Sequence, residues 1–205
     1  MVAAKKVDLK KEQKQLYTAP AGEVSEVPVP PANYLMISGA GDPNTSQEYK
    51  EAVEALFSVS YALKFSVKKA KGVDYAVMPL EGLWWTEAGK PFQSEDKSSW
   101  CWTAMIRQPE YVTQELYRTV LEEVKKKKRL PALSRIRFET YTEGKAIQIM
   151  HLGPYSEEHA TIERLHHYAR ERGYKLAGKH HEIYLNNPPR TAPPKLKTIL
   201  RQPVQ

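Results

Sequence analysis

Apolar and polar residues follow two spacings along the chain, and their order predicts strands and helices that recur in both halves. In the first half, three runs have the pattern of strands: 33–40, 75–86 and 100–107. From Ser46 to about Phe65, apolar residues recur every three or four positions, which predicts a helix. A second helix is predicted from 110 to about 127, because Pro109 precedes it and Pro131 follows it.

The second half repeats this order. Its predicted strands cover 135–142, 145–152, 179–185 and 195–203. The first two form a hairpin with Glu143-Gly144 as the turn. A helix is predicted at 155–172, capped by Ser156 at its start and by Gly173 just past its end.

The ends of the two halves indicate an internal duplication. Met105-Ile106-Arg107-Gln108-Pro109 resembles Ile199-Leu200-Arg201-Gln202-Pro203, and each run follows a strand that contains a glutamate, Glu81 or Glu182. We therefore expect an α+β fold of two β-α-β-β repeats related by a pseudo-twofold axis, with antiparallel sheets and helices on one face. A central ligand cleft would lie on the helix-free faces or at the seam between the repeats.

This duplication predicts the domain organisation. The expected parts are a flexible N-terminal arm at 1–21 and a single domain at 22–205, made of repeat one (about 22–109), a connecting helix (110–130) and repeat two (about 131–205).

Length and composition narrow the classes of protein. The 205 residues are 41% hydrophobic, enough for one large domain or two small ones with a buried core. No apolar run approaches the roughly 18 residues that a membrane span needs, and the Lys-rich N-terminus lacks the apolar stretch of a signal peptide. A single cysteine, Cys101, excludes an intramolecular disulfide and a cysteine-rich zinc site. We expect a soluble, cytoplasmic protein without a membrane partner, monomeric or homodimeric.

The net charge of +7 comes partly from two basic clusters, the lysines between 5 and 14 and the run 125–129. Such clusters can bind phosphate backbones, but a flexible tail and a solvated helix end have the same composition. The chain has no helix-turn-helix, zinc-finger or RRM signature. Nucleic acid is therefore not the expected partner.

The strand at 180–185, His-His-Glu-Ile-Tyr-Leu, carries the strongest chemical signal. Side chains alternate across a strand, so His180, Glu182 and Tyr184 share one face. A carboxylate on such a strand is costly to bury unless it is paired, solvated or functional. All three interpretations of Glu182 are open at this point.

Aromatic side chains are concentrated in the segments expected near the cleft: Trp84, Trp85, Trp100, Trp102, Tyr155 and Tyr184. They could form hydrophobic core, or a pocket for a planar ligand or a lipophilic cation. Glu81 is either the pseudo-twofold counterpart of Glu182 or a strand-end residue paired with a nearby Lys or Arg. Neither the histidines nor any other motif has the spacing of a metal, nucleotide or nucleophile site, so we expect no metal and no cofactor.

Four runs carry a family resemblance: 75–85 (Tyr-Ala-Val-Met-Pro-Leu-Glu-Gly-Leu-Trp-Trp), 102–106 (Trp-Thr-Ala-Met-Ile), 178–188 (Gly-Lys-His-His-Glu-Ile-Tyr-Leu-Asn-Asn-Pro) and 194–204 (Pro-Lys-Leu-Lys-Thr-Ile-Leu-Arg-Gln-Pro-Val). They resemble GyrI-like small-molecule-binding domains of the stand-alone type, over about residues 22–204. The resemblance implies a duplicated fold with a central cleft. It also implies that a glutamate at Glu182 meets cationic aromatic drugs in multidrug-sensing relatives.

In stand-alone relatives, the resemblance implies hydrolysis of the cyclopropane of DNA-alkylating natural products of the yatakemycin and CC-1065 type, which protects the cell. Glu182 would then act as general base on water, and Tyr61 or Tyr184 would donate a hydrogen bond to the ligand carbonyl. The ligand would stack among Trp84, Trp85, Trp102 and Tyr155, with His180 tuning the carboxylate. Two alternatives are binding or sequestration of aromatic or cationic drugs without turnover, and inhibition of DNA gyrase, supported only by the basic clusters.

Overall fold

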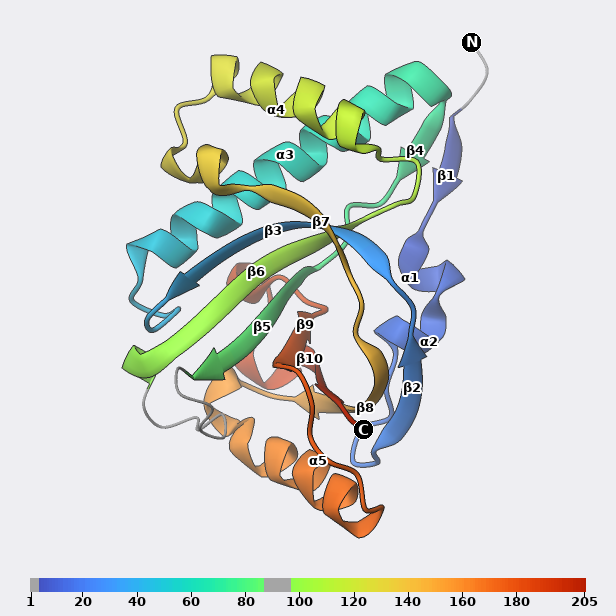
Figure 1. The fold of residues 1–205 in the computed structure, drawn as a ribbon, viewed down its shortest axis with the longest axis vertical. Coiled ribbons are helices and arrows are strands. Elements are labelled where there is room, and N and C mark those ends of the chain that lie inside the picture. The colour runs from blue at the N-terminus through green and yellow to red at the C-terminus, as the bar shows by residue number, and fades with distance from the viewer. Residues whose placement is uncertain (1–3, 87–96) are drawn as a thin grey trace.

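One antiparallel sheet of eight strands forms the centre of the fold (Figure 1). The computed structural model describes residues 4–86 and 97–205. The strands of this sheet are β2 (Ser25–Val29), β3 (Ala32–Ala40), β5 (Leu80–Thr86), β6 (Trp100–Gln108), β7 (Arg137–Tyr141), β8 (Gly144–Leu152), β9 (His180–Tyr184) and β10 (Lys197–Pro203). Their spatial order is β2-β8-β10-β9-β5-β6-β3-β7.

This order confirms the duplicated α+β fold and shows how its halves meet. Reading outward from the β5–β9 contact, β5 corresponds to β9, β6 to β10, β3 to β8 and β7 to β2. The two repeats therefore share one continuous sheet, and each has two strands before its main helix and two after it. The pseudo-twofold axis passes between β5 and β9, so the residues of these two strands lie at the centre of the molecule.

The two main helices, α3 (Gln47–Lys71) and α5 (His159–Glu171), pack on one face of the sheet, each against the outer strands of its own repeat. In α3, the Ser46 hydroxyl accepts a hydrogen bond from the Tyr49 N–H, and Gly72 ends the helix with a left-handed φ of 64°. The helix is six residues longer than the predicted end at Phe65. The third helix, α4 (Gln114–Lys127), packs mainly on α3, and its Tyr117 stacks on Phe138 of β7 with ring centroids 5.4 Å apart.

The start of α5 differs from the prediction. Tyr155–Glu157 form a 3₁₀ turn, and the α-helix begins only at His159. Glu158, not Ser156, therefore occupies the position before the first helical residue, and its side chain makes no capping hydrogen bond. The glycine predicted to end the helix, Gly173, has a φ of 70°, as a left-handed helix end requires.

The segment predicted to be a flexible N-terminal arm is packed against the domain, apart from residues 1–3, which lie outside the described residues. It contains β1 (Lys5–Val7), which pairs with β4 (Val73–Tyr75), followed by α1 (Leu9–Glu12) and α2 (Lys14–Tyr17). Leu9, Leu16 and Tyr17 are buried in the main core. The prediction of a flexible arm was wrong because these three apolar residues lie among lysines, so the segment as a whole has a polar composition.

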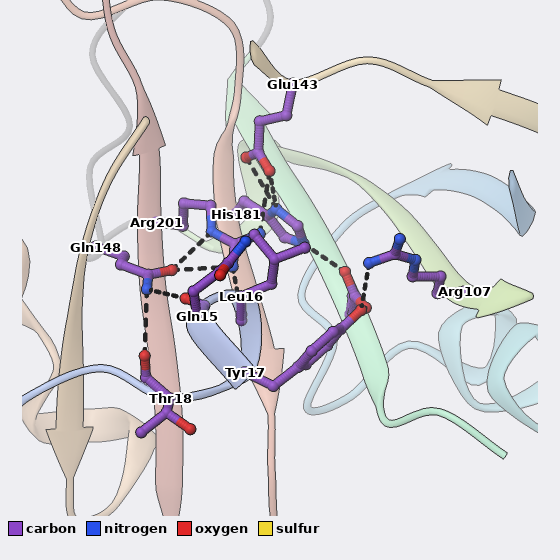
Figure 2. Close-up of polar contacts among 10 residues, drawn as sticks. Gln15, Leu16, Tyr17, Thr18, Arg107, Glu143, Gln148, His181 and Arg201 are labelled. Atoms are coloured by element: carbon purple, nitrogen blue, oxygen red, sulfur yellow. Dashed lines mark hydrogen bonds and ion pairs between the residues drawn. The ribbon is translucent and has the colours of Figure 1, made fainter. Parts of the chain in front are cut away.

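A buried network of charged side chains lies on the sheet face opposite α3 and α5. Figure 2 draws its polar contacts. At its centre is His181, whose Nδ1 lies 2.9 Å from Glu143 Oε1 and whose Nε2 lies 3.0 Å from Glu81 Oε2. Burial lowers the pKa of His181, but the two carboxylates outweigh it and raise the pKa to about 9. Burial raises the pKa of Glu143, but His181 and Arg201 outweigh it and keep it below its usual range.

The arginines of the two repeated Arg-Gln-Pro runs attach the N-terminal segment to this network. Arg201 donates to the Leu16 carbonyl and to Gln148 Oε1, and Arg107 Nη1 lies 3.4 Å from the Tyr17 hydroxyl. Tyr17 in turn donates to Glu81 Oε1 at 3.1 Å. Figure 2 shows Tyr17 reaching across toward Arg107 while Arg201 and Gln148 meet the backbone around Leu16 and Thr18. The repeated motif thus holds residues 15–18 in place.

The network predicts a stability loss on the alkaline side. Because the folded pKa of His181 lies above its ordinary value of about 6.5, its contribution is complete below that pH and is lost as pH rises through about 9. His181→Gln should lower the free energy of unfolding by about 3–5 kcal/mol near neutral pH. It should also flatten the decline between neutral and alkaline pH, as measured by urea unfolding.

His167→Gln is the matched control, because the His167 side chain is 64% exposed beside Glu171 on α5. It should change the free energy of unfolding by less than about 0.5 kcal/mol at each pH. An equally steep alkaline decline in wild type and His181→Gln would contradict the role given to the buried imidazolium.

Candidate functional site

A cleft of about 1140 Å³ opens between α3 and α5, above the β5–β9 contact at the pseudo-twofold axis. It lies at the seam on the helix-bearing face, and it is large enough for a drug-sized ligand. Its described walls include, from α3, Tyr49, Val53 and Phe57; from the central strands, Trp84, Glu182 and Tyr184; and from the region before and within α5, Tyr155, Glu158 and Ile162. Lys10 from the N-terminal segment also contributes.

Glu182 projects from β9 into this cleft, and the residue is only 5% exposed. The Tyr184 hydroxyl donates a hydrogen bond of 2.7 Å to Glu182 Oε2, and the Trp84 indole N–H donates to the Tyr184 oxygen at 3.1 Å. His180 Nε2 lies 3.5 Å from Glu182 Oε1. The carboxylate is therefore oriented from both sides by its strand neighbours, which share its face as alternation predicts.

A glycine on the neighbouring strand makes this arrangement possible. Gly82 pairs directly with Glu182, and a Cβ at Gly82 would lie 2.7 Å from Nε1 of Trp84. The indole therefore lies across the glycine, where its N–H reaches Tyr184. Gly39 has the same relation to Trp102, whose ring would be 2.3 Å from an added Cβ. Both glycines provide space for a large ring to lie against the sheet.

A second carboxylate, Glu158, lines the same cleft, and sequence reasoning missed it. It is 6% exposed, and its Oε1 is buried without a hydrogen-bond partner among the described residues. Burial, together with the charge of Glu182, raises the pKa of Glu158 to about 10. Burial thus favours the neutral form of Glu158 in the cleft that Glu182 also lines.

Aromatic rings form much of the remaining wall. Trp84 is in contact with Tyr49 and Trp100, with ring centroids 5.8 and 5.4 Å apart, and Tyr155 meets Tyr184 edge-on at 5.6 Å. Burial raises the pKa of Tyr155 to about 12, so its hydroxyl is neutral. Tyr49 and Phe57 were missed as site residues, although their spacing with Val53 along α3 marks one helix face.

Two residues predicted to line the cleft lie on the opposite face of the sheet. Glu81 pairs with Ile183, one position away from the Gly82–Glu182 pair, so its side chain points into the buried network. A register difference of one residue reverses the face, and Glu81 is therefore not the counterpart of Glu182. Trp85 follows Trp84 and also faces away, with Lys179 Nζ 3.3 Å from the centre of its ring.

Trp102 and Tyr61 also lie outside the described walls of the cleft. Trp102 is on the correct face but fully buried beneath Tyr49, with the ring centroids 5.0 Å apart. Tyr61 is 48% exposed and meets Phe57 at a centroid distance of 6.4 Å. It is one turn further along α3 than Phe57, where the helix has passed the end of the cleft.

The structure brings together four of the predicted site residues in the cleft: Trp84, Tyr155, Glu182 and Tyr184, with His180 directly beside Glu182. In residues 4–86 and 97–205, no group of three or more His, Cys, Asp or Glu side chains is arranged to hold a metal ion. Over the same residues, no helix combines the length and apolar composition needed to cross a bilayer.

A duplicated fold with a ligand-sized cleft at its seam agrees with the comparison to known families. Residues 22–205 match the GyrI-like small molecule binding domain. The chain belongs to the GyrI-like family. Its N-terminal segment, including Lys10 at the cleft, precedes the matched residues. The comparison with curated proteins found no match.

Three crystal structures from Listeria innocua are similar to this GyrI-like protein over nearly the whole chain. A conserved protein described as uncharacterized is 39% identical, with a TM-score of 0.89, covering 97% of this chain and 100% of its own. Two hydrolases are 38% and 36% identical, with TM-scores of 0.87 and 0.84, covering 98% and 97% of this chain and 100% of their own. The EcmrR C-terminal domain, 12% identical with a TM-score of 0.55 and covering 89% of this chain and 97% of its own, shows the fold alone.

Two tyrosines on α3 provide a direct test of the cleft. Tyr49→Ala should weaken the binding of a flat aromatic dye such as rhodamine 6G by roughly tenfold or more, because it removes a stacking surface from the wall. Tyr61→Ala is the matched control and should change the dissociation constant by less than about twofold. Fluorescence anisotropy measures both constants, and equal losses in the two variants would place the ligand elsewhere.

Proposed function

We propose that this GyrI-like protein hydrolyses electrophilic cyclopropanes carried by flat aromatic compounds, of the yatakemycin and CC-1065 type, and so protects the cell from these DNA-alkylating agents. The single observation that carries the proposal is the Glu182 carboxylate, buried among aromatic rings and oriented by Tyr184 and His180 while facing the cavity. The similarity to two hydrolases from Listeria innocua supports an enzymatic role.

The mechanism assigns general-base catalysis to Glu182. A polycyclic ligand stacks among Tyr49, Trp84 and Tyr155, which places its strained ring near the carboxylate. Glu182 removes a proton from water as the water oxygen attacks the cyclopropane carbon. Release of ring strain provides much of the driving force, so a modest rate enhancement is sufficient. General acid–base catalysis contributes about 10²–10⁴-fold.

The geometry changes the role of Tyr184. Its hydroxyl donates to Glu182, so it holds the base in position and is not directed at a ligand carbonyl. Tyr61, the other residue considered for that carbonyl, lies outside the described walls of the cleft. The donor for the ligand oxygen must therefore come from another part of the cleft.

A second candidate function is sequestration of lipophilic aromatic cations without turnover. The observation that favours it is the same carboxylate beside the faces of several aromatic rings, which suits charge pairing and cation–π contact. In that case an aromatic cation would bind wild type more tightly than Glu182→Gln, and a cyclopropane ligand would be recovered unchanged.

Mass spectrometry after incubation with a CC-1065-type alkylator separates the two functions. Wild-type protein should convert the compound to a product heavier by one water, and Glu182→Gln should slow this conversion by about 10²–10⁴-fold. Glu51→Gln is the matched control on α3, since Glu51 pairs with Gln47 outside the described cleft walls and should leave the rate unchanged. Equal rates for Glu182→Gln and wild type would refute the general-base role.

A further inference from the structure

Opening a cyclopropane conjugated to a carbonyl requires an acid as well as a base, since negative charge develops on the carbonyl oxygen. Glu182 receives the Tyr184 hydrogen bond, and the Tyr184 oxygen receives the Trp84 N–H. These hydrogen bonds therefore act on the base and are not directed at the ligand oxygen. Two further acidic residues line the cleft: Glu54, which is exposed on α3, and Glu158, which is buried and has no role so far.

Glu158 has an unusual position for a helix-terminal acid. It directly precedes α5, where a carboxylate commonly accepts hydrogen bonds from the first backbone N–H groups of the helix. Here its side chain makes no such bond; the backbone carbonyl of Glu158 accepts from Thr161 and Ile162, and the carboxyl lines the cleft. Glu158 is only 6% exposed, and its Oε1 has no hydrogen-bond partner among the described residues.

The surroundings of Glu158 favour a neutral carboxyl. Burial has the largest effect on its pKa, and the negative charge of Glu182 adds to it. The Thr198 hydroxyl and the Lys97 ammonium act in the opposite direction and are outweighed. Two carboxylates in one desolvated cleft cannot both ionise easily, so one keeps a proton while the other is charged.

We propose that Glu158 is the acid partner of Glu182 and donates its proton to the ligand, so that the cleft selects flat aromatic compounds carrying a ketone-like oxygen. This inference rests on the proposed function and names the substrate class of the same site. Three observations support it. Oε1 of Glu158 is buried without a hydrogen-bond partner, the side chain does not cap α5, and Glu158 lines the same cleft as Glu182.

The step balances between the two carboxyl groups. The water oxygen forms a bond to the cyclopropane methylene as Glu182 takes the water proton. The cyclopropane C–C bond breaks, and its electron pair moves through the conjugated system to the carbonyl oxygen, which takes the Glu158 proton. The product is a phenol that has gained one water. Glu158 is then charged and Glu182 protonated, and transfer of one proton from Glu182 to Glu158 restores the pair.

Binding of two matched probes tests the donor without turnover. Fluorenone and fluorene are flat and nearly equal in shape, and only fluorenone has a ketone oxygen. Wild type should bind fluorenone about 3–10-fold more tightly, as one added hydrogen bond predicts. Glu158→Ala should lose this preference, whereas Glu158→Gln should keep most of it because its amide still donates. A preference that persists in Glu158→Ala, or is absent in wild type, overturns the proposal.

Kinetics with a spirocyclopropyl cyclohexadienone test proton transfer. Glu158→Gln should lower kcat by about 10²–10⁴-fold while KM changes by less than about threefold, since the amide binds the oxygen but has no acidic proton. Glu158→Asp should recover part of kcat, and the adjacent Glu157→Gln should match wild type, because Glu157 is exposed outside the described walls. An unchanged kcat in Glu158→Gln overturns the acid role.

The two arms separate this inference from the proposed function. If wild-type protein leaves every cyclopropane unchanged, the hydrolase function and the proton-transfer step are both refuted. The preference for a ketone oxygen is then decided by the binding of fluorenone and fluorene alone. Turnover in wild type together with equal kcat in Glu158→Gln supports the hydrolase and refutes Glu158 as its acid.

Discussion

The constraint on which the structure depends is the burial of acidic side chains on both faces of its two central strands. The strands β5 and β9 meet at the pseudo-twofold axis, and alternation places His181 on one face and Glu182 on the next. On the first face, Glu81 and Glu143 are neutralised by His181 and Arg201. On the second, Glu182 is held by the Tyr184 hydroxyl and the His180 imidazole, the Trp84 indole donates to Tyr184, and burial favours the neutral form of Glu158.

One face of the sheet contributes to stability, and the other carries the candidate site. The ion network attaches the N-terminal segment to the sheet through Arg201 and Tyr17, and it fixes β9 through His181. The residue that follows on that strand is Glu182, so the position of the base depends on ion pairs that lie outside the described walls of the cleft. Burying an ion pair is costly unless its partners are well placed, and here His181 of the central strand contacts two buried carboxylates. The cleft can then leave one carboxyl oxygen without a partner, as a site for a ligand requires.

The sequence predicted the duplicated fold and the face of β9 because both depend on local spacing. His180, Glu182 and Tyr184 lie together as alternation required, and the recurring Arg-Gln-Pro run marked equivalent strands. The same reasoning could not determine the register between β5 and β9, and one residue of offset placed Glu81 on the other face. Apolar periodicity on α3 likewise could not show where the cleft ends, so Tyr61 was included and Tyr49 was missed.

The N-terminal segment and Glu158 escaped prediction for a different reason. Leu16 and Tyr17 have few apolar neighbours in the sequence, and their burial depends on Arg201 and Glu81, which are distant in the chain. In the sequence Glu158 looks like an ordinary helix-start acid, and only its position in the cleft and its unpartnered Oε1 set it apart. In both cases a contact between residues far apart in the chain determines what the residue does, and the local composition does not reveal that contact.

Infrared difference spectroscopy across a pH titration tests most directly whether the cleft holds one charged and one protonated carboxyl. The account predicts a carboxylic acid C=O band at neutral pH in wild type that disappears in Glu158→Gln and persists in Glu182→Gln, where burial still favours the neutral form. The absence of this band in wild type at neutral pH, or its survival in Glu158→Gln, would contradict the account.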